Sequence, residues 1–332
     1  MTRLILIAAP LAIFLASFLV GRYPIDLPGV LHIFAAELGL VTPHGPPVLR
    51  SVIIDIRLPR IVAGMLVGGG LALSGACYQA VFRNPLVSPF TLGVSAGAGF
   101  GAALAILLWP APGAIIASAF GFGLLAVALC FLLGFGRGTA GASPLALVLG
   151  GIVVGAFFTA LLSLLKYLAD PEAKLPLIEF WLLGSLANAS RRDALMLVAL
   201  LLPAGGVLLT LRWRLNLLML GDDEARTLGV EAGRLRLIVV ALATLIAAAP
   251  VAVAGIVGWV GLVVPHAARL LVGADTRRLL PAAASMGACY LLFVDDLARS
   301  VTAGEVPIGI LTALIGAPVF AVLLRRGGLG WA

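Results

Sequence analysis

The sequence predicts an all-α polytopic membrane protein with about ten transmembrane helices. Of its 332 residues, 62% are hydrophobic and only 11% are charged. The mean hydropathy of +1.16 lies far above that of soluble globular domains. Charge-free runs of about 20 residues, the length that crosses a bilayer as a helix, recur along the chain. No linker or polar domain separates them, so residues 1–332 are expected to form a single transmembrane domain.

Nine apolar runs are each long enough to cross a bilayer, because a helix rises about 1.5 Å per residue. In chain order they cover residues 4–20, 61–81, 92–109, 114–135, 144–165, 195–211, 237–257, 279–294 and 306–324. The first run has the form of a signal peptide as well, but an uncleaved span is expected because so many spans follow it.

A tenth, shorter helix is expected at residues 259–272, almost directly after the span at 237–257. The combined apolar run is too long for one crossing, and Gly255, Gly258 and Gly261 offer a bend. A short helix at membrane depth must be surrounded by protein or water, since lipid cannot satisfy its free backbone groups. This segment is therefore expected to line a pathway, with a re-entrant structural hairpin as the alternative.

Basic residues indicate how the spans are oriented. Ten crossings place both termini on one side. If that side is cytoplasmic, twelve of the 22 lysines and arginines fall inside and nine outside, with Arg269 assigned to neither. The bias agrees with the positive-inside rule, so cytoplasmic termini are expected. Because the bias is weak, the outer face is unusually basic, which points to an acidic partner there. Membrane anchoring also accounts for the net charge of +7, and no nucleic-acid partner is expected.

Several predicted spans carry glycines at four-residue spacing. Such faces let helices approach closely in lipid, and ordinary tight packing is expected for all of them. The glycines concerned are Gly64, Gly68, Gly93, Gly97, Gly101, Gly151 and Gly155.

The sequence has no ATP-binding motif. No GxxxxGKS/T phosphate-binding loop occurs, and the two lysines, Lys166 and Lys174, lie in one segment between spans. Ion-coupled carriers place carboxylates or histidines within their spans, whereas most of the predicted spans have no ionisable residue. Asp295 and Asp296 come closest, and a local ion pair with Arg299 explains them. The chain is therefore not expected to be an enzyme, and secondary transport is the weaker alternative.

Histidines and cysteines are too scattered to form a metal or catalytic site. No two histidines have metal-ligand spacing, no nucleophile has an evident base, and each cysteine lies in an apolar run. No metal and no cofactor in the chain are expected. The residues concerned are His32, His44, His266, Cys77, Cys130 and Cys289.

One long charged stretch, residues 212–236, separates two very apolar halves. It predicts a short helix at about residues 223–228, with Asp222 as the N-cap, acidic residues in the first turn and Gly229 ending it. A connecting loop that happens to coil is the alternative. If the helix is functional, a protein outside the membrane must bind it.

Five segments resemble the permease subunits of ABC importers for iron chelates, haem and cobalamin, known as the FecCD-type or type II importer family. They are RLPR at 57–60, LSGACYQAVFRNPLVSPFTLGVSAGA at 73–98, LGDDEARTLGV at 220–230, GIVGWVGLVVPHAARLLVGAD at 255–275 and GEVPIGILTALIGAPVF at 304–320. The resemblance covers nearly the whole chain, and the motifs occur in the family's order. It implies the type II ABC importer permease fold in the bacterial inner membrane. It also implies a homodimer with two cytoplasmic ATPase subunits, which bind ATP and Mg²⁺, and a periplasmic substrate-binding protein.

The resemblance also assigns roles to residues. The short charged helix corresponds to the coupling helix that docks on the ATPase, and it contains Gly221, Asp222, Asp223, Glu224, Ala225, Arg226, Leu228 and Gly229. Three arginines, Arg57, Arg60 and Arg299, match external arginines that meet glutamates on the binding protein. Capping of helices and neutralisation of nearby acids is the structural alternative for them.

Two further motifs match the family pattern. Ala142 and Ser143, in the turn before the span at 144–165, correspond to a cytoplasmic gate. Pro265, His266 and Arg269 form a family motif in the short helix, where a structural hydrogen bond of His266 is expected.

The resemblance thus implies the permease subunit of an ATP-driven importer that moves an iron chelate, haem or a cobalamin-like substrate into the cytoplasm. Oxyanions such as molybdate are also possible cargo, and no residue selects among these substrates. An ion-coupled secondary transporter and a scaffold-like membrane subunit are the alternatives.

Overall fold

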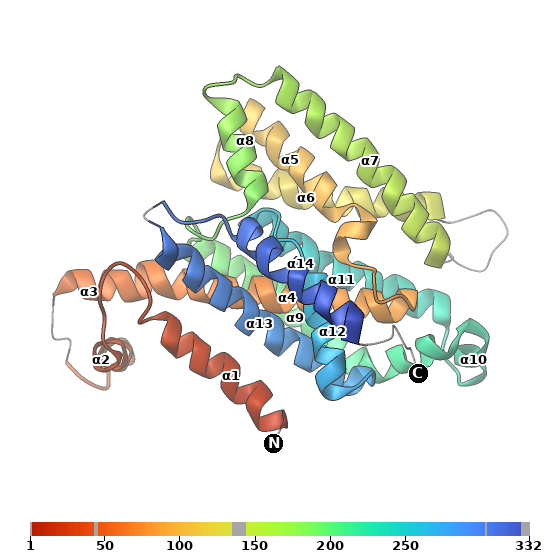
Figure 1. Ribbon diagram of the computed structural model, residues 1–332, viewed down its shortest axis with the longest axis horizontal. Helices are drawn as coiled ribbons and strands as arrows, with labels where there is room; N and C mark the ends of the chain where they lie inside the picture. Colours follow the sequence, from red (N-terminus) through yellow and green to blue (C-terminus); the bar gives the residue numbers. More distant parts are fainter. Residues whose placement is uncertain (1, 43–45, 135–143, 303, 327–332) are drawn as a thin grey trace.

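The structure is a computed structural model that describes residues 2–42, 46–134, 144–302 and 304–326. Within these residues all regular structure is helical (Figure 1). Six helices are long and apolar enough to cross a membrane, and five shorter apolar helices accompany them. The prediction of an all-α polytopic membrane protein with about ten membrane helices is confirmed.

Ten helices coincide with the ten predicted spans, most of them to within a few residues at each end. They are α1 (Thr2–Ser17), α4 (Leu58–Phe82), α5 (Val94–Leu108), α6 (Pro112–Gly134), α7 (Pro144–Leu168), α9 (Arg191–Leu220), α11 (Ala232–Ala254), α12 (Val260–Val272), α13 (Thr276–Val301) and α14 (Ile308–Arg326).

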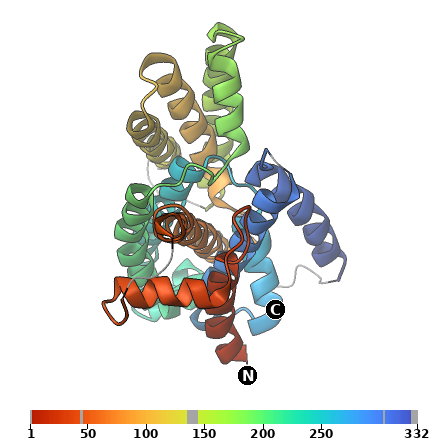
Figure 2. The same cartoon turned by 90° about the vertical axis from the view of Figure 1, so that its left-hand side faces the viewer.

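Two helices between the spans were not predicted. They are α2 (Leu27–Glu37) and α8 (Lys174–Leu183). Each is too short to cross a bilayer, so a search for apolar runs passes over it. The start of α2 is local in origin, because the carboxylate of Asp26 accepts the backbone N–H of Gly29 at 3.1 Å. Figures 1 and 2 together show that α2 runs across the long axis of the molecule.

The central helix is α4, which continues α3 (Pro47–Ser51) and the π-helical turn η1 (Val52–Arg57) into one helix of 36 residues. The widened turn comes directly before Pro59, which has no backbone N–H and whose ring would clash with the carbonyl of Asp55 in an ordinary α-helix. Helices α9, α11, α12 and α13 surround α4.

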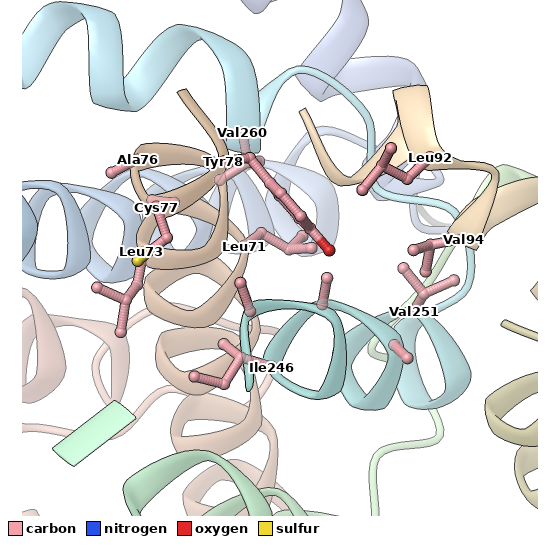
Figure 3. Close-up of a cluster of buried hydrophobic side chains, with 14 of the residues drawn as sticks. Leu71, Leu73, Ala76, Cys77, Tyr78, Leu92, Val94, Ile246, Val251 and Val260 are labelled. Atoms are coloured by element: carbon pink, nitrogen blue, oxygen red, sulfur yellow. The ribbon is translucent and has the colours of Figure 1, made fainter. Parts of the chain in front are cut away.

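Glycines set how closely the neighbours of α4 approach. A Cβ atom on Gly68 would lie 2.2 Å from the carbonyl oxygen of Gly287 in α13. One on Gly75 would lie 1.8 Å from the carbonyl oxygen of Gly261 in α12. No side chain fits at either position, so the backbones are in direct contact there. Figure 3 shows Tyr78 of α4 enclosed among buried side chains of the core.

A second group of helices, α5, α6 and α7, packs by the same means. Cβ atoms on Gly97 and Gly101 would lie 2.4 Å from carbonyl oxygens of α6, and one on Gly151 would lie 2.2 Å from the carbonyl oxygen of Thr91. Thr91 belongs to the 3₁₀ turn η2 (Pro89–Leu92). Close packing at these predicted glycines is therefore observed. At Gly64, Gly93 and Gly155 an added Cβ atom would have only ordinary contacts, of 3.4, 3.5 and 3.9 Å.

The helical structure is interrupted between α11 and α12, as the sequence predicts. Gly255 has a φ of 71°, and a Cβ atom there would lie 2.3 Å from the carbonyl oxygen of Trp181. Trp259, which precedes α12, has a φ of 69°, in the left-handed region that side chains other than glycine rarely adopt. Gly258 lies in the break, but Gly261 lies inside α12, where it allows the contact with α4.

Candidate functional site

The short charged helix is α10 (Asp222–Thr227), and it lies at one end of the molecule, opposite α2 and α3 (Figure 1). Ala225 is fully buried and packs α10 onto the ends of α9 and α11. Val230, just after the helix, is also buried in the core. A six-residue helix is not stable alone, so these contacts hold it in place.

One ion pair ties the start of α10 to the membrane domain. Nη2 of Arg236, a nearly buried side chain of α11, lies 2.7 Å from Oδ1 of Asp222. The prediction that Asp222 caps the helix is wrong, because Gly221 is the N-cap and Asp222 is the first helical residue. The Asp222 carboxylate turns to Arg236 instead of to the backbone N–H groups of its own helix.

The end of α10 agrees with the sequence. Gly229 has a φ of 79°, and its N–H donates to the carbonyl of Arg226 at 2.9 Å. The N–H of Val230 donates to the carbonyl of Ala225 at 2.9 Å. This pair of bonds closes the last turn, and the left-handed residue between them favours glycine.

The outer face of α10 is exposed and mixed in character. Asp223, Glu224 and Arg226 are exposed charged residues, and Asp223 lies 3.7 Å from Arg226 in a solvent-exposed ion pair. Leu228 beside them is 56% exposed. An apolar side chain ringed by charged groups is typical of the centre of a small protein–protein contact. The inner face of α10 is therefore buried against α9 and α11, and its outer face is exposed and of the kind that another protein can bind.

At the opposite end, the three predicted arginines lie together but are buried. Arg60 forms two bonds with the carboxylate of Asp295, from Nε to Oδ2 at 2.9 Å and from Nη2 to Oδ1 at 2.8 Å. The other edge of its guanidinium bonds Glu305 at 3.0 and 3.1 Å. Asp295 is fully buried, whereas the Glu305 side chain is 29% exposed. Arg60 is therefore shared between two carboxylates.

The other two arginines hold the end of α1. Arg57 donates to the backbone carbonyls of Phe18 and Tyr23. Arg299 donates to the carbonyl of Ser17 at 2.8 Å and pairs with Asp296. The predicted local pair of Arg299 with Asp296 is therefore present.

The main partner of Asp295 was not predicted. Arg60 bonds it directly, whereas Nε of Arg299 stays 4.0 Å away. Three arginines thus face three carboxylates, and we call these six residues the charge cluster. They are Arg57, Arg60, Arg299, Asp295, Asp296 and Glu305. Equal numbers of opposite charges give a weak long-range field. This geometry favours the structural alternative for the arginines, and docking on them stays a prediction.

The motif in α12 is largely buried. His266 packs edge-on against the ring of Phe320 in α14, with ring centroids 5.9 Å apart. Among the described residues neither ring nitrogen of His266 has a hydrogen-bond partner, so the expected structural bond is not found there. Arg269 donates to the side chain of Gln79 at 3.3 Å, and Pro265 is buried inside α12. The motif thus joins α12 to α4 and α14.

Two further predictions concern the gate and metal binding. Ala142 and Ser143, the expected gate, lie outside the described residues. Within the described ranges, no three histidines, cysteines or acids gather closely enough to hold a metal ion.

Sequence reasoning missed two ion pairs, the partly buried pair of Asp222 with Arg236 and the buried pair of Arg60 with Asp295. The available signal was a charged residue at the end of an otherwise apolar run, since burial of such a group requires an opposite charge. That signal says a partner exists but does not say which one.

Comparison with known proteins agrees with this geometry. Residues 7–326 match the FecCD transport family. The chain is 44% identical over 315 residues to the molybdate import system permease protein MolB of Haemophilus influenzae, covering 93% of this chain and 92% of that protein. It is 42% identical over 278 residues to a probable iron chelatin transport system permease protein of Helicobacter pylori, covering 84% and 83% of the two chains.

A solved structure shares the whole architecture. It is described as an inward-facing conformation of a metal-chelate type ABC transporter, and it superposes with a TM-score of 0.86 at 42% identity, covering 97% of this chain and 98% of that one. None of the relatives named here is an ion-coupled carrier, so the secondary-transport alternative gains no support. With a helical architecture, a family match over nearly its full length and relatives of this identity, the chain is an ABC importer permease that belongs to the FecCD transport family.

Proposed function

We propose that this chain pairs with a second copy of itself to form the membrane pathway of an importer whose energy comes from two separate ATPase subunits bound at α10. The observation that supports this most is the construction of α10. Its base is fixed by Ala225 and the Asp222–Arg236 ion pair, while its outer face is left exposed. A helix held rigidly at its base can pass movement of a bound protein to α9 and α11.

The α10 end is proposed to face the cytoplasm, with both termini on that side. Lys166 pairs with Glu179 at 2.6 Å, and Arg50 pairs with Glu37 at 2.5 Å. With the charge cluster, these pairs neutralise much of the basic charge at the other end. The positive-inside rule itself counts only lysines and arginines, and their bias of twelve to nine favours the α10 end as the cytoplasmic one.

The other end is proposed to receive a periplasmic binding protein that delivers the substrate. We propose that Arg57, Arg60 and Arg299 serve this docking by holding the ends of α1, α4 and α13 in shape. Arg60 and Arg299 are already paired with carboxylates within the chain, and Arg57 donates to backbone carbonyls beyond the end of α1. The proposed substrate is a compound of a transition metal, namely an iron chelate, haem or a cobalamin-like molecule. Molybdate joins this class because the MolB relative is a molybdate permease.

The test of the coupling role changes the outer face of α10 alone. Leu228→Asp and Glu224→Arg should leave the permease folded in the membrane but release the ATPase, because a mismatched charge buried in a small contact costs several kcal/mol. Co-purification of the ATPase on tagged permease measures this.

The matched controls are exposed residues at the opposite end, Leu40→Asp and Glu172→Arg. Both controls should retain the ATPase. Equal retention by Leu228→Asp, Glu224→Arg and the controls would remove the coupling assignment.

A further inference from the structure

A pocket of about 510 Å³ is lined by the second half of α9 and the start of α13. These parts of the two helices lie toward the α10 end of the molecule (Figure 1). Its lining combines two guanidinium groups and an indole with smaller side chains, and it is open to the surface of the molecule. The lining residues are Leu209, Thr210, Arg212, Trp213 and Arg277.

The basic groups of this pocket retain free donors. Nη1 of Arg212 donates to the backbone carbonyl of Arg277 at 3.3 Å, which brings the two residues together and leaves most of the Arg212 donors unused. In the described part of the chain, the Arg277 guanidinium forms no ion pair. Arg214 adds a third positive charge, with its Cζ 5.8 Å from the centre of the Trp213 ring.

One carboxylate, that of Asp275, lies two residues before Arg277 and is held by hydrogen bonds. Oδ1 of Asp275 accepts the side-chain amide of Asn216 at 2.7 Å and the backbone N–H of Arg277 at 2.9 Å. The hydrogen bond from Asn216 holds the pKa of Asp275 below its usual range. Along α9 no acidic residue occurs after Asp193. The ionised Asp275 offsets part of the charge of Arg277, but the three arginines Arg212, Arg214 and Arg277 still leave the pocket with a net positive charge that fits an anion.

The position of the pocket along α9 favours a membrane anion. Leu202 and Val207, one to three turns earlier, are exposed apolar side chains, and Arg212 is the first charged residue after a long apolar run. Trp213 is 43% exposed. Tryptophan beside arginine at the end of an apolar run is typical of the membrane–water boundary, where lipid phosphates lie.

We propose that this pocket binds the phosphate group of an anionic phospholipid, with Arg212 and Arg277 as the phosphate-binding residues and Trp213 beside them. Guanidinium groups bind phosphate oxygens through paired N–H groups, which suits two arginines converging on one site. Because α9 leads directly into α10, a lipid held here fixes the helix that carries the coupling surface. The site goes beyond the transport function proposed above and does not depend on it.

The experiment titrates the purified full-length permease with phosphatidylglycerol, in detergent containing phosphatidylcholine, and counts bound lipids by native mass spectrometry. An arginine near an anionic surface contributes roughly fivefold to affinity, so R212Q/R277Q should bind phosphatidylglycerol roughly thirtyfold more weakly than the unaltered chain. The matched control is R191Q/R192Q, which removes the same charge from the opposite end of α9 and should bind as the unaltered chain does.

A second variant separates a pocket from general surface charge. Thr210→Trp places a bulky side chain in the pocket and leaves every arginine in place, so it should also weaken lipid binding. Unchanged lipid binding in either Thr210→Trp or R212Q/R277Q would overturn the site. A last titration adds inorganic phosphate as a competitor of the bound lipid. Displacement of phosphatidylglycerol by millimolar phosphate would show a site for small free anions and overturn the lipid assignment, whereas retention of the lipid supports it.

Discussion

Replacement of Asp295 tests the structural role of the charge cluster. The Asp295 carboxylate is fully buried and accepts two N–H groups of Arg60 at 2.8 and 2.9 Å. Asp295→Asn keeps the size of the side chain but removes the charge that neutralises Arg60. Loss of one member of a buried pair costs about 3–5 kcal/mol, because the remaining charge is poorly solvated. Glu305 still pairs with Arg60, so we expect the lower end of that range, about 3 kcal/mol.

Thermal unfolding measured with a thiol-reactive fluorescent dye reports this directly, since Cys77 and Cys130 are buried in the folded chain and react once it unfolds. The matched control is Glu179→Gln, which breaks the exposed ion pair with Lys166. Exposed pairs contribute about 0–1 kcal/mol, so the control should unfold close to the unaltered chain.

A double variant, Arg60→Met with Asp295→Leu, completes the test. Apolar residues of similar size can replace a buried ion pair without loss of stability, so the double variant should be more stable than Asp295→Asn. If Asp295→Asn unfolds with the Glu179→Gln control, our account of the cluster is wrong. If the stable double variant fails to bind the binding protein, Arg60 acts in docking through its charge.

Two further predictions concern packing and the base of α10. Gly75→Ala should sharply lower the yield of folded permease, because its Cβ atom would lie 1.8 Å from the carbonyl oxygen of Gly261. Gly121→Ala, in an open part of α6, should leave the yield unchanged. Size-exclusion profiles compare the two variants, and equal yields would contradict the contact. Arg236→Gln should loosen α10 by releasing Asp222, at a cost of about 1–3 kcal/mol since Asp222 is partly exposed. Faster amide hydrogen exchange confined to α10 would show this loosening. Unchanged exchange would show that the Asp222–Arg236 ion pair does not hold α10 in place.

Much of the fold follows from the sequence because the bilayer imposes a length. The ten spans could be predicted from apolar runs, and the break at Gly255 from a run too long for one crossing. Helices α2 and α8 could not, because a helix too short to cross the bilayer has no such length requirement. The π-helical turn before Pro59 depends on an otherwise continuous helix, which the sequence alone does not reveal.

Some features of the candidate site could likewise be predicted from the sequence, and others could not. The end of α10 could be placed at Gly229, since the conformation needed there favours glycine. Its start was misassigned because an aspartate at a helix start can cap the helix or form an ion pair, and the choice depends on how near Arg236 lies in space. Arg60 and Asp295 are 235 positions apart, so only the folded chain shows that they are partners.

Uptake into proteoliposomes tests the central claim, that α10 couples this permease to ATP hydrolysis. The chain is reconstituted with its ATPase and binding protein, and uptake of the radiolabelled compound selected by the binding protein is measured. We predict uptake that requires ATP, is lost in Leu228→Asp and is kept in the Leu40→Asp control. Uptake driven by a proton or sodium gradient without ATP, or normal ATP-driven uptake in Leu228→Asp, would contradict the account.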